Sequence, residues 1–212
     1  MKKVLLLHGF ARKNSDMRVL GDLLAECGLE CTLLDLPLTY KPVEYSAAVL
    51  EKVLDELIPR LKADEKVSLV GHSTGGLVIR KFLTDTKHLD RVNRCVLIAA
   101  PNGGSRLADL AGSYARFSLG IFQTLKSLMT ANIPLLNLLD TSPEVGAIAG
   151  NNNNLFLGRW LRSENDGRVE VQSVYYEGLK DFIVLPYGHM DIHYQPETAR
   201  YVYRFLRYGT FQ

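Results

Sequence analysis

Residues 67–77 read Val-Ser-Leu-Val-Gly-His-Ser-Thr-Gly-Gly-Leu, and this stretch decides the fold. Its first residues form a largely apolar run that predicts a buried strand, and Leu77–Leu83 continues as a helix. The Gly-x-Ser-x-Gly pattern between them is typical of a tight strand-to-helix turn, in which glycines leave room for a strained backbone. Such a turn exposes the serine hydroxyl and aims the N–H groups of the following helix at developing negative charge. The pattern therefore predicts Ser73 as a nucleophile.

Strands and helices alternate on both sides of this turn. Short apolar runs predict strands at Val4–Leu7, Glu30–Leu36, Val67–Val70, Cys95–Ala99, Val145–Ala149 and Phe182–Leu185. The clearest helix is Val43–Leu61; Ser15 is expected to N-cap the first helix, Gly28 to end it, and Pro196 to open the last one. This alternation predicts an α/β fold with a mostly parallel sheet and right-handed crossovers. No repeat or linker divides the chain, so residues 1–212 are expected to form one domain.

Composition narrows the class of protein. The 212 residues are 47% hydrophobic and 23% charged, which fits a globular domain with a full-sized core. Lys and Arg number 25 against 23 Asp and Glu, without a basic stripe, so no nucleic-acid partner is expected. No apolar run approaches the roughly 18 residues of a transmembrane helix. The run Val4–Leu7 is too short for a signal peptide, so a cytoplasmic location is expected. In such a location the three cysteines, Cys27, Cys31 and Cys95, are expected to be reduced core residues.

Three motifs together resemble the α/β-hydrolase superfamily. They are His8-Gly9-Phe10 after the first strand, the turn at Gly71–Gly76, and Ala100–Gly104 after a later strand. The likeness is closest to the lipase and esterase branch, which includes bacterial lipases and lipid deacylases, and it spans Val4–Leu206. It implies a minimal α/β-hydrolase fold of about six strands, because the two antiparallel strands that open larger relatives have no counterpart before His8.

The resemblance also implies a catalytic triad in the chain order serine, acid, histidine. A serine hydroxyl is a weak nucleophile and needs a base, which a third group orients. Two of the five histidines, His189 and His193, follow the last predicted strand. His189 is favoured as the base because it lies closer to that strand, and His193 remains the alternative.

The expected acid is Asp166, because Asp166-Gly167-Arg168-Val169 resembles the Asp-Gly-x-Val segment of the lipase branch. Glu164 and Asp181 are its rivals; Asp181 directly precedes the last strand, which places it at the wrong end of the sheet. An Asp-Gly pair is also a common turn.

The resemblance implies that the backbone N–H groups of Phe10 and Thr74 form the oxyanion hole. His8 is expected to bond the loop backbone rather than to take part in the chemistry.

Residues 105–142 resemble nothing specific and contain no clear strand. Their apolar residues suggest one or two helices, and segments at this point of the fold often cap the active site. Ile121, Phe122 and Leu135 are candidate pocket residues, although such side chains also pack on the sheet as the fold's own helix. Arg106, Arg116 and Lys126 show no pattern that would bind an acidic head group.

These features predict a serine hydrolase that cleaves small-molecule carboxylic esters with an apolar acyl or alkyl group, through an acyl-enzyme and without metal or organic cofactor. The same triad would serve a thioesterase, an amidase or an acyltransferase, because the pocket chooses the leaving group and the acceptor. A third reading is a non-catalytic member of the fold that binds a hydrophobic ligand.

Overall fold

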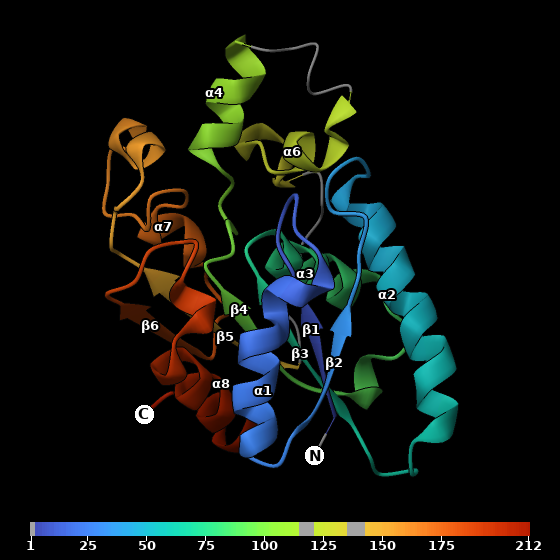
Figure 1. Cartoon of the computed structure of the whole chain (residues 1–212). Helices are drawn as coiled ribbons and strands as arrows, with labels where there is room; N and C mark the ends of the chain where they lie inside the picture. The colour runs from blue at the N-terminus through green and yellow to red at the C-terminus, as the bar shows by residue number, and fades with distance from the viewer. Residues whose placement is uncertain (1–2, 115–120, 135–142) are drawn as a thin grey trace.

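A six-stranded sheet forms the centre of the protein, seen in a computed structural model that describes residues 3–114, 121–134 and 143–212 (Figure 1). The strands are β1 (Lys3–Leu7), β2 (Glu30–Leu34), β3 (Val67–His72), β4 (Val92–Ile98), β5 (Glu144–Gly150) and β6 (Asp181–Leu185). Their order across the sheet is β2-β1-β3-β4-β5-β6, and every neighbouring pair is parallel. The predicted sheet of about six mostly parallel strands is confirmed.

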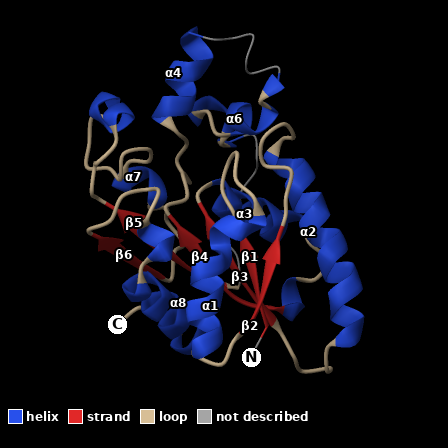
Figure 2. Ribbon diagram, in the orientation of Figure 1, coloured by secondary structure: helices blue, strands red, loops and turns tan. Residues whose placement is uncertain are grey.

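Helices cover both faces of this sheet (Figure 2). Helices α1 (Arg18–Glu26) and α8 (Pro196–Tyr208) lie on one face, and α2 (Val43–Leu57) and α3 (Thr74–Asp85) lie on the other. Successive residues of a strand point to opposite faces, so the buried strands feed two separate cores. Leu6, Val70 and Val96 pack toward α1 and α8, whereas Leu5, Leu69 and Leu97 pack toward α2 and α3.

Short helices complete the connections between these elements. They are η1 (Asn14–Met17), η2 (Ile58–Arg60), η3 (Leu89–Arg91), α4 (Arg106–Tyr114), α6 (Gln123–Ser127), η4 (Thr130–Asn132), η6 (Phe156–Trp160), α7 (Val171–Val174) and η7 (Ile192–Tyr194). Figure 1 shows α4 and α6 beyond the carboxyl ends of the strands, which is where the loops of a parallel sheet gather. No helix in the described ranges is long and apolar enough to cross a membrane.

Two predicted helix boundaries are wrong. The helix predicted to run to Leu61 ends at Leu57 and passes into the 3-10 turn η2, because Pro59 has no N–H to donate and its ring crowds the preceding turn. Ser15 does not cap α1, since the chain enters that helix through η1 and Met17 takes the cap position without a side-chain bond. Gly28 does follow α1 with a φ of 82°, as predicted for its end.

The cysteines differ from the expectation that all three are core residues. Cys95 is buried in β4, Cys31 is partly buried in β2, and Cys27 is exposed after α1; all three are unpaired. Cys27 directly follows the last residue of α1, in the exposed turn that leads to β2, so it lies outside the core.

Candidate active site

Ser73 lies at the turn between β3 and α3 with a strained backbone, φ 53° and ψ −123°. Two neighbouring glycines allow this conformation. A Cβ on Gly71 would lie 2.5 Å from the backbone carbon of Gly75, and a Cβ on Gly75 would lie 2.6 Å from the carbonyl oxygen of Leu7. The Ser73 N–H donates to the Ile98 carbonyl at 2.8 Å, which fixes the turn against β4. The sequence pattern therefore corresponds to a sterically determined turn.

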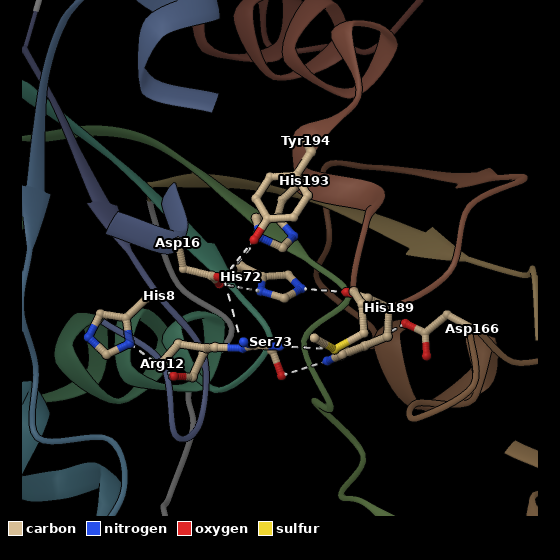
Figure 3. A network of polar contacts seen from close by, with 11 residues as sticks. His8, Arg12, Asp16, His72, Ser73, Asp166, His189, His193 and Tyr194 are labelled. Atoms are coloured by element: carbon tan, nitrogen blue, oxygen red, sulfur yellow. Dashed lines mark hydrogen bonds and ion pairs between the residues drawn. The ribbon is translucent and has the colours of Figure 1, made fainter. Parts of the chain in front are cut away.

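His189 lies in the loop after β6 and contacts both other residues that the sequence selected (Figure 3). Its Nδ1 is 2.7 Å from Asp166 Oδ2, and its Nε2 is 3.0 Å from Ser73 Oγ. A carboxylate only accepts hydrogen bonds, so Nδ1–H donates to Asp166 and Nε2 is left to accept from the serine hydroxyl. The His189 N–H also donates to the Asp166 carbonyl at 2.8 Å. The structure thus brings Ser73, His189 and Asp166 together in one hydrogen-bonded chain.

Asp166 is fully buried, and its two carboxylate oxygens have different partners. Oδ1 accepts from the backbone N–H groups of Arg168 at 2.9 Å and Val169 at 2.7 Å, while Oδ2 accepts from His189. These bonds stabilise a buried charge that would otherwise be costly. The turn also needs Gly167, whose φ is 96°.

The rival acids lie elsewhere. Glu164 Oε1 accepts from Asn151 Nδ2 at 2.7 Å. Asp181 begins β6 at the opposite end of the sheet, where its Oδ2 accepts from the N–H of Phe211 at 2.6 Å and the hydroxyl of Thr210 at 2.9 Å. It anchors the C-terminal segment rather than facing His189.

The two residues expected to form an oxyanion hole are both close to Ser73, one in sequence and one at the same cavity. Thr74 is the first residue of α3, where helix N–H groups have no partner within the helix. Phe10 lines the same cavity as Ser73. His8 bonds the backbone near Phe10: its Nδ1–H donates to the Gly9 carbonyl at 2.9 Å, and its Nε2 accepts from the Leu36 N–H at 3.0 Å. His8 therefore bonds the loop backbone, as expected.

A cavity of about 230 Å³ opens beside Ser73 and His189. Its remaining lining residues are Phe10, Pro101, Ser105, Leu107, Ala108, Leu125, Leu128, Arg168 and Val169. Several of these belong to the segment 105–142. The wall of the cavity is therefore mainly apolar.

The predicted pocket residues of that segment lie in different places. Ile121 is 52% exposed and is not among the lining residues. Phe122 packs edge-on against Phe10, a lining residue of the cavity, at a ring-centroid distance of 6.3 Å. It also stacks on Tyr40 at 5.7 Å. Leu135 lies outside the described residues. Leu125 and Leu128, one helical turn further along, provide the described apolar wall instead.

A buried cluster lies behind His189 that the sequence reasoning missed (Figure 3). The Nε2–H of His72 donates to the His189 carbonyl at 3.0 Å, and the His72 ring stacks on His193 with centroids 3.9 Å apart. His193 Nε2 in turn lies 3.3 Å from Asp16 Oδ2. His193, the rival base, thus packs behind the loop of His189. The signal available in the sequence was His72 itself, next to the nucleophile.

The titration of this cluster reflects its burial. Burial, followed by the charges of His193 and His189, holds the pKa of His72 well below its usual value. Burial also raises the pKa of Asp16, but hydrogen bonds with His193 and Tyr194 outweigh it and leave that pKa lowered. The Tyr194 hydroxyl donates to Asp16 Oδ1 at 2.7 Å.

Two groups of described residues bring three potential metal ligands together: Asp16, His72 and His193, and Glu51, Asp55 and His88. In the first group the two imidazole planes meet at only 22°. A metal ion lies in the plane of each ring that binds it, and two nearly parallel planes do not meet near the rings. In the second group the ammonium of Lys87 already lies 2.8 Å from Asp55. The first geometry suits stacking, and the second suits a surface ion-pair network.

Comparisons with known proteins agree with this architecture. A sequence model described as the alpha/beta hydrolase family matches residues 4–187. No curated protein matches the sequence. The mature lipase BlEst2 of Bacillus licheniformis superposes with a TM-score of 0.81 at 22% identity, over 97% of this chain and 91% of that chain.

Two further solved structures are similar in fold. Phospholipase PlaB of Legionella pneumophila has a TM-score of 0.74 at 18% identity, over 99% of this chain and 60% of that chain. An esterase from Thermogutta terrifontis has a TM-score of 0.61 at 17% identity, over 98% of this chain and 90% of that chain. The predicted fold and the resemblance to the α/β-hydrolase superfamily are confirmed.

Proposed function

We propose that this chain, which belongs to the alpha/beta hydrolase family, hydrolyses carboxylic esters with Ser73 as the nucleophile. The observation that carries the proposal is the continuous hydrogen-bonded chain from Ser73 Oγ through His189 to Asp166, with distances of 3.0 Å and 2.7 Å. Each atom in it has the donor or acceptor role that acyl transfer needs. The names of the lipase, phospholipase and esterase structures to which the chain is similar support the same class of reaction.

In the proposed mechanism, Ser73 Oγ attacks the ester carbonyl carbon while its proton passes to His189 Nε2. Asp166 Oδ2 stabilises the resulting imidazolium and keeps the ring oriented. The carbonyl oxygen becomes an oxyanion, which the N–H groups of Phe10 and Thr74 bind. The C–O bond of the ester then breaks, and His189 returns the proton to the leaving alcohol. Water, deprotonated by His189, attacks the acyl-enzyme and releases the carboxylic acid and free Ser73.

The cavity beside Ser73 supports a substrate with an apolar acyl or alkyl group. Leu107, Ala108, Leu125 and Leu128 line it with apolar side chains, and burying a hydrocarbon chain there is favourable in proportion to the area removed from water. We propose that the segment 105–142 acts as the cap of this cavity.

Active-site labelling tests the proposal. A fluorophosphonate probe should label the wild-type protein at Ser73, and short p-nitrophenyl esters should be hydrolysed. Ser73→Ala should lose both properties, whereas Ser113→Ala, on the exposed side of α4, should keep them. Full hydrolysis by Ser73→Ala would refute the assignment.

Two histidine variants compared side by side test the base. His189→Ala should lower kcat by several orders of magnitude, because the nucleophile then has no proton acceptor. His193→Ala should reduce kcat far less, since His193 lies behind the loop. The opposite ranking would make His193 the base. Thioester and amide substrates in the same assay would identify the preferred leaving group.

A further inference from the structure

The guanidinium-bearing residue Arg168 lines the same cavity as Ser73 and His189. Most of the other lining residues are apolar, and Arg168 is the one described lining residue with a permanent charge. A charged fork at an otherwise apolar catalytic cavity is chemically distinctive, because each of its N–H groups needs an acceptor.

The backbone of Arg168 is held rigidly with respect to the catalytic chain. Its N–H donates to Asp166 Oδ1 at 2.9 Å, and the next N–H, of Val169, donates to the same oxygen at 2.7 Å. Asp166 Oδ2 bonds His189. The turn that holds Asp166 therefore also fixes where Arg168 lies at the cavity wall.

No described residue forms an ion pair with this cation, although the charge of Asp166 favours it from nearby. The Nε of Arg168 is buried without a hydrogen-bond partner, and within the described ranges no carboxylate forms an ion pair with its guanidinium. Arg94, by contrast, bonds Glu144 at 2.6 Å, and Arg12 lies 3.9 Å from Asp16. Asp166 is nearby, but its oxygens are bound to backbone N–H groups and to His189.

The surroundings of Arg168 disfavour an uncompensated charge. Burial, followed by the positive charge of Arg12, lowers the pKa of Arg168. An arginine nevertheless stays protonated at neutral pH, since guanidinium is so weak an acid. A partly buried cation without a partner is costly, and an anion that enters the cavity would remove this cost.

We propose that the substrate is an ester that also carries an anionic group, a carboxylate or a phosphate, which Arg168 binds while Ser73 attacks the ester carbonyl. This inference rests on the proposed function. The planar guanidinium matches either oxyanion with paired N–H···O bonds. The apolar wall would hold the hydrocarbon part of the same molecule. Arg168 is thus a specificity-determining residue for an amphiphilic, negatively charged ester.

Matched substrate pairs test the proposal. Monoethyl adipate is compared with its neutral amide, ethyl adipamate, for the carboxylate; monobutyrylglycerol phosphate is compared with monobutyrylglycerol for the phosphate. For at least one pair, the wild-type kcat/KM for the anionic ester should exceed that for the neutral partner by about tenfold or more, as expected for charge-assisted hydrogen bonds. The preferred pair identifies the anion.

Variants locate the source of this preference. Arg168→Gln should lower the ratio of anionic to neutral kcat/KM by about tenfold or more, and Arg168→Lys should lower it less, because lysine keeps the charge but loses the fork. Arg162→Gln removes an exposed arginine that does not line the cavity and should leave the ratio unchanged. Labelling by an uncharged fluorophosphonate reports whether each variant keeps its catalytic residues in place.

The outcomes separate the two proposals. Equal wild-type rates within both pairs, with Ser73 labelled and esters hydrolysed, would overturn the role of Arg168 and leave the ester hydrolase standing. A fall of both rates by the same factor in Arg168→Gln would also overturn it, since it would show a role only in the Asp166 turn. Failure to label Ser73 or to hydrolyse any ester would refute the proposed function and the inference with it.

Discussion

His72 occupies an unusual place, since it is adjacent to the nucleophile in sequence but points away from it. Its Nε2–H supports the carbonyl of His189, and its ring is pressed against His193. Both contacts suit a neutral imidazole, because a second proton would put a charge in a buried site beside His193 and His189, where the nearest carboxylate oxygen is Asp16 Oδ2, 4.0 Å from Nδ1. We infer that His72 is a positioning residue, which holds the loop of His189, the proposed base, without touching the reacting atoms.

This arrangement predicts how stability changes with pH. The pKa of His72 is lower in the folded state than in the unfolded chain, so below about 6.5 the unfolded state binds a proton that the folded state resists. The free energy of unfolding should therefore fall as pH drops from about 7 to 5, by up to about 1.4 kcal/mol per pH unit for one proton. The lowered pKa of Asp16 acts in a separate window, since it removes stability only below about pH 4.

Urea unfolding at several pH values, compared for the wild type and His72→Phe, measures this slope. Phenylalanine keeps a ring against His193 but cannot be protonated, so the slope should become shallower. His88→Phe is a change outside the cluster, so the contribution of His72 to the pH dependence of the free energy of unfolding should be retained in it. An unchanged slope in His72→Phe would show that another group resists protonation.

At the scale of elements, the unit β3–turn–α3 sets the position of the nucleophile. The strand is buried along its whole length, and the helix that follows packs against it and against α2. The turn passes so close to β1 that only glycine fits at residue 75. Close backbone contact, rather than hydrogen bonding by side chains, therefore determines where Ser73 lies.

Alanine substitutions distinguish crowding from backbone strain. Gly75→Ala places a Cβ 2.6 Å from the Leu7 carbonyl oxygen and 2.7 Å from that of His8, and neither backbone atom can move freely. We expect a loss of about 3 kcal/mol in the free energy of unfolding. In Gly28→Ala the new Cβ meets open space, so only the backbone φ of 82° opposes it. We expect this variant to lose about 1 kcal/mol in the free energy of unfolding.

Chemical denaturation of both variants gives the two losses directly. Activity should fall with Gly75→Ala even where the protein remains folded, because the turn moves, and Gly28→Ala should keep wild-type activity. Equal losses of stability would mean that the contact at residue 75 relaxes at little cost.

At the scale of the whole molecule, the catalytic cavity is assembled from segments that are far apart in the sequence. Phe10 follows β1, Ser73 follows β3, Pro101 follows β4, Val169 follows β5 and His189 follows β6. Parallel strands bring all their carboxyl ends to one edge, so these loops meet there. Leu107, Ala108, Leu125 and Leu128 add the apolar side of the cavity.

The size of this cavity predicts a preference for short acyl chains. Leu125→Ala should enlarge the apolar wall and shift the best p-nitrophenyl ester toward a longer chain, because the extra methylene groups then find room. Ile121→Ala, four residues away and half exposed, should not change the chain-length profile. The ratio of kcat/KM across an ester series measures the shift. If Ile121→Ala alone shifted the profile, Ile121 would line the acyl pocket, as predicted from the sequence, and Leu125 would not.

The amino-acid sequence by itself determined the fold class, the six strands and the turn at Ser73, because strand periodicity and the Gly-x-Ser-x-Gly pattern can be read from consecutive residues. It also selected His189 and Asp166 by chain order. In the structure His189 lies within hydrogen-bond distance of Ser73, and Asp166 lies within hydrogen-bond distance of His189. The end of α2 at Leu57 was readable from Pro59, but the entry to α1 through η1 was not.

Only the tertiary structure decided what surrounds these residues. The stacking of His72 on His193, the apolar wall at Leu125 and Leu128, and the position of Arg168 at the cavity of Ser73 all join segments separated by tens of residues or more. No local pattern encodes such contacts, since they depend on how the strand-end loops pack against one another. A short sequence pattern thus predicts the turn that carries the proposed nucleophile, whereas long-range packing decides what surrounds it.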